Sequence, residues 1–262
     1  MAAAEGLEQP FRRRTVSFSR LDGRLNARHQ GAWNRYAGEL LLDVPRGVAR
    51  TSVAPEHRLD AAAVFGRVAP LVVEVGSGAG DAVVHAAAAR PEADFLAVEV
   101  YRPGVAQTLA KVGAQGLTNV RVVQADAVDV LGTMLPRGSV EQVWVFFPDP
   151  WHKSRHVKRR LVTPELAGLV AGCLAPQGLW RLATDWADYA VQMRDVAEAS
   201  PHFTNRYAGR LASAQDPRGG FAPRFEGRVM TRFERKGLAV GRRVFDLALD
   251  RARRPPALPR QL

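Results

Sequence analysis

Cysteine is almost absent from this chain: Cys173 is the one cysteine in 262 residues. A single cysteine excludes an internal disulfide and a cysteine-based metal cluster, and its apolar surroundings predict a small core residue. Long hydrophobic runs are absent too, since no apolar stretch approaches the roughly 18 residues that a membrane span requires. The arginines at positions 12–14 are not followed by the hydrophobic region of a signal peptide. We therefore expect a cytoplasmic protein without a membrane anchor.

Acidic residues are in deficit. The chain has 26 Asp and Glu against 37 Lys and Arg, which gives a formal net charge of +11. An excess of this size favours a polyanionic partner. Composition alone does not separate RNA, DNA and anionic lipid, so the kind of polyanion has to be inferred from motifs.

Hydrophobic residues make up 47% of the chain, which is enough for the core of one α/β domain. We expect that single domain over residues 31–250. Residues 1–30 are predicted to form a flexible basic arm, and residues 251–262 a disordered tail rich in arginine and proline. Within the domain, residues 30–42 predict a short amphipathic helix and residues 55–67 another helical stretch.

One stretch organises the rest of the chain. Residues 71–75 read Leu-Val-Val-Glu-Val, which is typical of a buried strand in a parallel sheet. Gly76, Gly78 and Gly80 follow as a turn into an apolar helix, and glycines there let the backbone approach a ligand closely. The dinucleotide fingerprint G-x-G-x-x-G starting at Gly76 would need a third glycine at position 81, which is Asp81. A nicotinamide oxidoreductase is therefore disfavoured.

An acidic residue followed by G-x-G-x-G resembles the first motif of the Rossmann-like S-adenosylmethionine-dependent methyltransferases. The predicted strand at 95–100 contains Glu99, placed where a carboxylate can accept hydrogen bonds from a ribose diol. Strand and helix patterns then alternate to residue 199, which predicts a doubly wound α/β sheet. The resemblance implies a mostly parallel, seven-stranded sheet with an antiparallel last strand.

Carboxylates stand at the ends of the first five predicted strands: Glu74, Glu99, Asp126, Asp149 and Asp185. Ligands of open α/β sheets bind outside the carboxyl ends of the strands, so these side chains are candidates for one site. A carboxylate at a strand end also caps the next helix or accepts from loop N–H groups, and this structural explanation stays open for each of them. Five in register at one edge are harder to explain by capping alone.

The segment at 146–151, Phe-Phe-Pro-Asp-Pro-Trp, is the sharpest local motif. Its prolines fix the backbone so that Asp149 points at a methyl acceptor while an aromatic ring can stack on a base. A basic run follows at residues 152–160. A solvated surface is the common explanation of such a run, but its place beside the predicted site favours RNA binding.

Taken together, these motifs resemble the bacterial tRNA (guanine-N7-)-methyltransferase family. The resemblance rests on the glycine motif, Glu99, the basic Pro-Asp-Pro-Trp segment, the sequence Thr-Asp-Trp at 184–186 and the stretch 231–237, all in one order. It covers about Arg20 to Arg251. It implies transfer of a methyl group from S-adenosylmethionine to N7 of a guanine in the variable loop of tRNA.

The resemblance also implies roles for individual residues. The cofactor would be bound by Glu74, Gly76, Gly78, Glu99, Asp126 and Asp149, and Asp149 would also be the catalytic residue. The substrate RNA would be bound by Lys153, Asp185, Thr231, Arg232, Phe233 and Glu234. Thr231 and Glu234 also have the spacing of a capping box that opens a short helix, and both interpretations can hold.

The chemistry needs little from the protein besides alignment. N7 of guanine has an in-plane lone pair and no proton, so its methylation requires no strong general base and no metal. Catalysis then depends on aligning N7, methyl and sulfur, with reacting atoms about 3–3.5 Å apart. Asp149 would orient the reactants or act electrostatically, and Asp185 could accept hydrogen bonds from the guanine N1–H and 2-amino group.

Two other functions remain open. An S-adenosylmethionine-dependent enzyme could methylate an amino group of nucleic acid or protein, because Pro-Asp-Pro-Trp is chemically close to amino-methylating motifs. A non-catalytic RNA-binding protein could retain the fold, although the intact glycine turn and the strand-end acids argue against it. The sequence is compatible with a monomer and with a homodimer.

Overall fold

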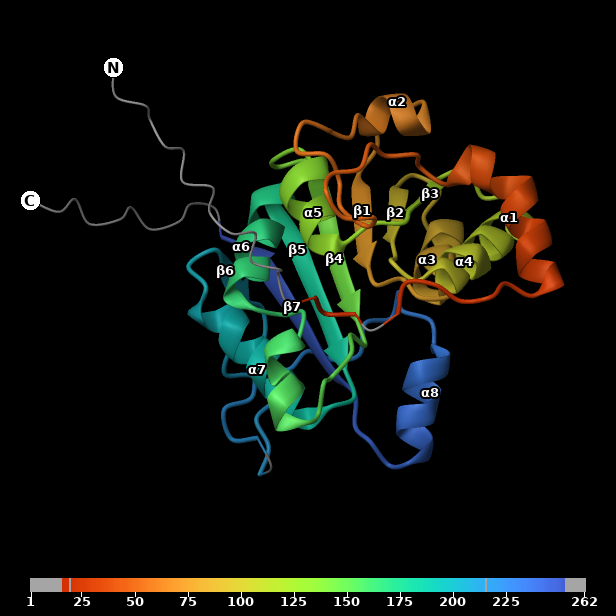
Figure 1. The fold of residues 1–262 in the computed structure, drawn as a ribbon. Helices are drawn as coiled ribbons and strands as arrows, with labels where there is room; N and C mark the ends of the chain where they lie inside the picture. Colours follow the sequence, from red (N-terminus) through yellow and green to blue (C-terminus); the bar gives the residue numbers. More distant parts are fainter. Residues whose placement is uncertain (1–15, 19, 215, 253–262) are drawn as a thin grey trace, which may run out of the picture.

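A seven-stranded sheet with helices on both faces forms the centre of the computed structural model, which describes residues 16–18, 20–214 and 216–252 (Figure 1). The strands are β1 (Leu71–Val75), β2 (Asp94–Val98), β3 (Val120–Val123), β4 (Val140–Phe146), β5 (Leu174–Thr184), β6 (Phe203–Asn205) and β7 (Phe245–Arg251). Their order in the sheet is β3-β2-β1-β4-β5-β7-β6. β1 to β5 pair in parallel, and β7 is antiparallel to β5 and β6. The predicted sheet with an antiparallel last strand is confirmed.

Helices connect these strands. They are α1 (Ala27–Leu40), α2 (Ala61–Phe65), α3 (Asp81–Ala89), α4 (Arg102–Gln115), α5 (Ala127–Asp129), α6 (Pro164–Cys173), α7 (Ala187–Ala199) and α8 (Arg232–Ala239). A π-helical turn, η1 (Val130–Met134), follows α5, and a 3₁₀ helix, η2 (Ser154–Arg159), follows β4. Within the described part of the chain, none of these helices is long and apolar enough to cross a membrane.

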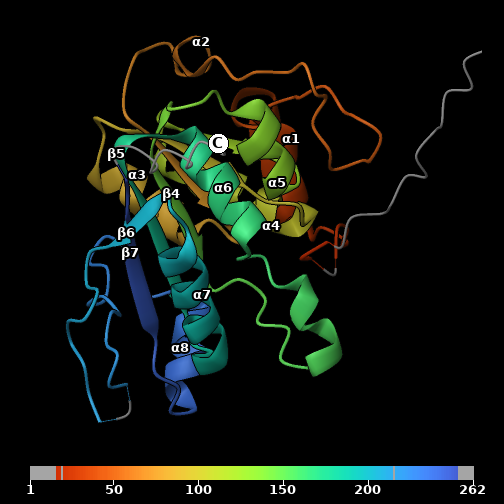
Figure 2. The ribbon, with the colours of Figure 1, turned by 90° about the vertical axis from the view of Figure 1, so that its left-hand side faces the viewer.

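The alternation of side chains along the strands divides the core into two layers. Leu71, Val73 and Val75 of β1 belong to the layer that α6 and α7 cover, and Val72 belongs to the layer under α3 and α4. Both faces are therefore apolar, as a doubly wound sheet requires. Figure 2 shows the sheet from the side of α6 and α7. Cys173 is buried in the first layer, as predicted, and burial raises the pKa of its thiol to about 12.

Two elements differ from the sequence-based prediction. β5 begins at Leu174, directly after α6, and runs through Pro176 and Gly178, whereas the sequence pattern at 178–183 predicts a strand that starts only at Gly178. The β4–β5 pairing is irregular where it passes these residues, so the strand continues through them. The helix expected over 55–67 is the shorter α2, because Asp60 caps it by accepting a hydrogen bond from Ala63 N–H (3.0 Å).

The carboxyl ends of the parallel strands point toward the end of the molecule where α8 lies, and α2 lies at the opposite end in both views (Figures 1 and 2). The predicted basic arm and tail fall partly outside the described residues, namely at 1–15, 19 and 253–262. Where the structure describes these regions, α1 already begins at Ala27 and β7 continues to Arg251.

Candidate active site

A cavity of about 480 Å³ opens at the carboxyl ends of the parallel strands. Five of the residues predicted from the sequence line it: Gly76, Gly78, Glu99, Asp126 and Asp149. Gly76 and Gly78 have φ angles of 69° and 57°, which a side chain would strain, so the glycine turn needs glycine at both positions. The fold thus brings together residues that are up to 73 positions apart (149 − 76 = 73).

Glu99 is fixed by the backbone that surrounds it. One oxygen accepts hydrogen bonds from the N–H groups of Val100 and Tyr101 (both 2.8 Å), and the other accepts from Gly78 N–H (2.7 Å). A carboxylate has about four acceptor positions, so this arrangement leaves one for a ligand hydroxyl. Burial raises the pKa of Glu99, and the three hydrogen bonds oppose this.

Glu74 lies deeper, on the other side of the glycine turn. The residue is 4% exposed, and its carboxyl group accepts a hydrogen bond from Val83 N–H in the first turn of α3 (3.0 Å). Burial raises its pKa to about 8, so the group is largely protonated at neutral pH. The side chain lines a neighbouring cavity rather than the 480 Å³ cavity. Glu74 therefore also has a structural role, as a strand-end acid that accepts a hydrogen bond from a helix N–H group.

Asp126 also has a structural role. It is the N-cap of α5 and accepts a hydrogen bond from Val128 N–H (2.9 Å). It lines the cavity at the end of β3, so capping does not remove it from the site. Capping and ligand binding are compatible because a carboxylate has several acceptor positions.

Asp149 differs from these three carboxylates. No hydrogen bond from the described residues reaches its carboxylate, which lies where the 480 Å³ cavity meets a smaller one beside residues 150–156. The residue is exposed, but the cavity walls desolvate the carboxyl group and raise its pKa, while the charge of Arg159 lowers it. Phe147 and Trp151, on either side of the Pro-Asp-Pro sequence, have positive φ angles of 52° and 44°. Strained backbone of this kind is typical of functional sites.

Residues 16–18 lie across the Pro-Asp-Pro-Trp segment. Trp151 Nε1 donates to the carbonyl of Ser17 (3.0 Å), and Arg159 donates to the carbonyls of Val16 (3.2 Å) and Phe18 (2.8 Å). The Arg159 guanidinium also lies over the Trp151 ring, 3.9 Å from its centre. Ser17 and Phe18 line the cavity. No sequence pattern indicates these contacts, because the residues that make them are 134 to 143 positions apart in the chain.

The basic run at 152–160 divides into exposed and structural residues. Lys153, Arg155 and Lys158 are exposed, and Lys153 lines the small cavity beside Asp149. Arg160 is 5% exposed and is bound to the carbonyl of Pro150 (2.8 Å) and the carboxylate of Asp188 in α7 (2.6 Å). The exposed residues are free to meet a phosphate, whereas Arg160 anchors the segment.

Asp185 is held against α8. Its Oδ2 atom accepts a hydrogen bond from Arg242 Nη1 (2.9 Å), and a Cβ on Gly237 would lie 2.5 Å from the same oxygen. Only glycine therefore allows α8 to pack this closely. Arg242 in turn lies over the Trp186 ring, 5.0 Å from its centre, and Trp186 contacts His152.

Glu234 is buried, at 1% exposure, and two arginines hold it. Arg224 donates to both of its carboxylate oxygens (2.8 and 3.1 Å), and Arg228 donates to one of them (3.2 Å). Burial alone would raise the pKa of Glu234, but the two arginines outweigh it and lower the pKa. Arg228 is fully buried, pairs with Asp246 of β7 (2.5 and 3.1 Å), and lies over the Phe147 ring.

Thr231 caps α8 and also faces a cavity. Its Oγ1 accepts a hydrogen bond from Glu234 N–H (3.1 Å), so the first half of the capping box is formed. The residue lines the cavity that also contains Glu74. Arg232 and Phe233 belong to α8, but the structure does not describe their side chains. Arg228 and Arg242, which hold the predicted residues in place, have no recognisable sequence signal.

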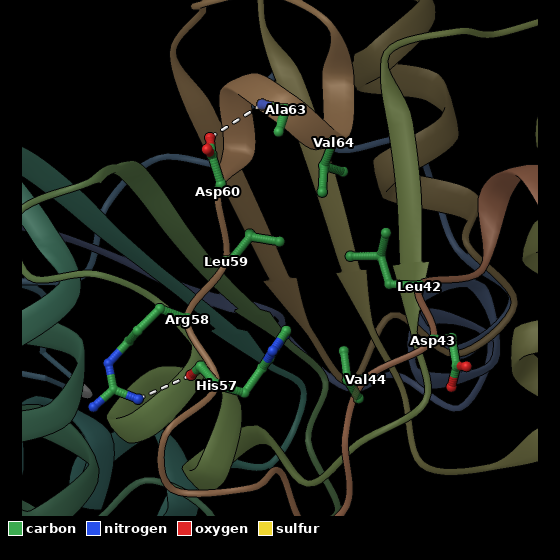
Figure 3. Close-up of a pocket in the computed structure, with 9 residues that line it drawn as sticks. All are labelled: Leu42, Asp43, Val44, His57, Arg58, Leu59, Asp60, Ala63 and Val64. Carbon is green, nitrogen blue, oxygen red and sulfur yellow. Dashed lines mark hydrogen bonds between the residues drawn. The ribbon is translucent and has the colours of Figure 1, made fainter.

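A further cavity lies beside α2, at the opposite end of the molecule (Figure 3). Its volume is about 250 Å³, and Leu42, Val44 and Leu59 form an apolar wall. Two of its charged groups are bound locally, since Asp60 caps α2 and Arg58 donates to the carbonyl of His57 (2.9 Å). No strand-end carboxylate lines it, which leaves the 480 Å³ cavity as the candidate active site.

The strand order, the glycine turn and the carboxylates beside it define a Rossmann-like class I methyltransferase. In agreement, the structure is similar to that of the 16S rRNA methyltransferase KamB, with a TM-score of 0.50 over 79% of this chain and 99% of that chain. At 17% identity this similarity shows the fold alone.

Sequence comparison identifies the family. Residues 68–247 match the family model described as putative methyltransferase. The chain is 49% identical to the tRNA (guanine-N(7)-)-methyltransferase of Arthrobacter sp. (strain FB24), over 91% of this chain and 86% of that protein. It is 48% identical to the protein of the same name from Cutibacterium acnes, over 92% and 84%. The chain belongs to the tRNA (guanine-N7-)-methyltransferase family.

S-adenosylmethionine is the cofactor of this methyltransferase, and the donor set of the cavity fits it. Glu99 offers an acceptor for a ribose hydroxyl, and the glycine turn lets the backbone approach closely. The cavity has a size usual for a small-molecule site.

Proposed function

We propose that this protein transfers the methyl group of S-adenosylmethionine to N7 of a guanine in the variable loop of tRNA, forming 7-methylguanosine. Membership of the family supports the reaction. The observation that carries the proposal is the position of Asp149. Asp149 lines both the cavity that holds the backbone-bound acids and the small cavity of the exposed Lys153, and its carboxylate has no hydrogen bond from the described residues.

The residues are proposed to act as follows. Glu74, Gly76, Gly78, Glu99 and Asp126 form the cofactor side of the site. Asp149 stands at the junction of cofactor and guanine. Substrate RNA is bound by Lys153, Asp185, Thr231, Arg232, Phe233 and Glu234, with Glu234 acting by fixing the start of α8.

Asp149 needs no proton transfer in this mechanism. The bound cofactor supplies an electrophilic methyl group on a positively charged sulfur. Because N7 has no proton to lose, no general base is needed, and the Asp149 carboxylate would lie beside the positive charge that the purine would gain on methylation. The strained turn at Phe147 and the anchor at Arg160 hold this carboxylate in place, so the reactants are aligned before reaction.

The deciding experiment is transfer of labelled methyl from S-adenosylmethionine to unmodified bulk tRNA, followed by nucleoside analysis. We expect one labelled product, 7-methylguanosine, and strand cleavage after borohydride and aniline treatment. Label in another nucleoside would overturn the N7 assignment in favour of amino methylation. Because the substrate is tRNA, we also infer a cytoplasmic enzyme.

A further inference from the structure

Four cavities adjoin one another in a row, because each shares lining residues with the next. The small cavity beside Lys153 shares Asp149 with the 480 Å³ cavity. The 480 Å³ cavity also shares Gly76, Gly78 and Phe147 with a third cavity, of about 550 Å³. The third cavity meets a fourth, of about 520 Å³, at the ion pair of Asp81 and Lys111, because both of these residues line both cavities. The last two form a continuous trough between α3 and α4 on one side and the start of α8 on the other.

Basic residues line this trough, which we name the α3–α8 trough. Arg235 and Lys236 are exposed on α8 and form no ion pair with the described residues. Lys111 faces them from α4, and His85 is exposed on α3. The trough therefore has basic groups on both walls.

Negative charge in the trough is compensated. Asp81 is paired with Lys111, and Glu74 is largely protonated at neutral pH because burial raises its pKa to about 8. Arg235 and Lys236 are then two positive charges without an acidic partner among the described residues, which suits an anionic ligand.

We propose that the α3–α8 trough binds the ribose–phosphate backbone of the tRNA next to the target guanine. This rests on the proposed function and adds a second RNA-binding wall. Lys153, Arg155 and Lys158 contact the RNA on one side of the cofactor cavity, while Arg235 and Lys236 contact it on the other. Two walls on either side of the methyl-transfer point fix the guanine more firmly than one.

The test is the double substitution Arg235→Gln and Lys236→Gln in the full chain, which removes both charges but keeps good helix formers. tRNA affinity is measured against KCl concentration. We expect about tenfold weaker binding at 0.1 M KCl and a salt slope reduced by about 2, since each lost phosphate contact removes about 0.7–0.9. S-adenosylmethionine affinity, measured by calorimetry, should not change, which also verifies folding.

The matched control is Arg137→Gln with Arg210→Gln. Both arginines are exposed, and neither lines the row of cavities. Equal salt slopes for the two double variants would overturn the proposal, and so would weaker cofactor binding in place of weaker tRNA binding. A product other than 7-methylguanosine, with the slope still reduced, would overturn the proposed reaction alone.

Discussion

The carboxylates of the two halves of the site are held in different ways. On the cofactor side, Glu74, Glu99 and Asp126 all accept hydrogen bonds from backbone N–H groups. On the proposed acceptor side, arginine side chains hold Asp185 and Glu234. Backbone donors are fixed once the strand–turn–helix unit has formed, whereas an arginine partner depends on how distant segments pack.

The electrostatic consequences are opposite. Burial raises the pKa of Glu74 and Glu99, because N–H groups do not compensate the lost solvation. Paired arginines lower the pKa of the equally buried Glu234. Glu74 is therefore largely protonated at neutral pH, while Glu234 keeps its negative charge beside two arginines. We call an exposed pair exchangeable, because it can be broken by a polar ligand at little cost in free energy. We call a buried pair permanent, because breaking it leaves an unpaired charge in the interior.

The largest effect should come from the buried arginine. Arg228→Ala leaves Asp246 without its partner in the interior and removes one of two from Glu234. We expect a loss of about 3–5 kcal/mol in the free energy of unfolding, measured in urea, because an unpaired buried charge is costly. Arg228→Lys keeps the charge and should lose less. A loss below 1 kcal/mol for the alanine variant would contradict the view that this pair is permanent.

The next largest effect is expected at Asp149, the carboxylate that belongs to neither half. Asp149→Ala should lower kcat by about 10²–10³-fold, the usual cost of a lost electrostatic group in a preorganised site. Much of the tRNA affinity should remain, because Lys153 and the α3–α8 trough are untouched. Asp149→Asn is the matched variant, since it keeps the shape and removes the charge. Near-normal turnover in both would mean that the acceptor site is misplaced.

The glycine-turn part of the cofactor half could be predicted from sequence because it is contiguous in the chain. A strand, a glycine turn and a helix follow one another from residue 71 to 89, and the positive φ angles of Gly76 and Gly78 are what such a turn requires. The same locality explains why the strand predicted at 71–75 is found with these limits as β1, whereas the strand predicted at 95–100 is found as β2, Asp94–Val98.

The acceptor half could be predicted only as a list of residues. Nothing in the local pattern indicates that Arg228 will meet Asp246, or that Trp151 will bind the carbonyl of Ser17. These contacts result from packing between elements that are far apart in the chain. Arg160 is buried and Lys153 is exposed, although both belong to one basic run, and this difference can be read only from the fold.

The pH dependence of stability tests the cofactor half. Glu74 has a pKa of about 8 in the folded state against 4.5 for an ordinary glutamate, so between these values the folded protein holds a proton that the unfolded chain has lost. Stability should therefore fall as pH rises, by up to about 1.4 kcal/mol per pH unit, or about 2 kcal/mol from pH 6 to 7.5. Glu74→Gln should abolish this component. Parallel pH profiles for the two proteins would show that Glu74 titrates normally.

The smallest effect is expected at the exposed pair of the acceptor half. Arg242 and Asp185 have side-chain exposures of 45% and 17%, so Arg242→Ala should cost less than about 1 kcal/mol of stability. A double-mutant cycle with Asp185→Asn measures the coupling free energy between the two side chains directly. If this coupling were as large as the loss expected for Arg228→Ala, the distinction between exchangeable and permanent pairs would be wrong. A small value means that Asp185 can release Arg242 at little cost. The guanine N1–H and 2-amino group present two parallel donors, as a guanidinium does, so the carboxylate could then accept the base in place of the arginine.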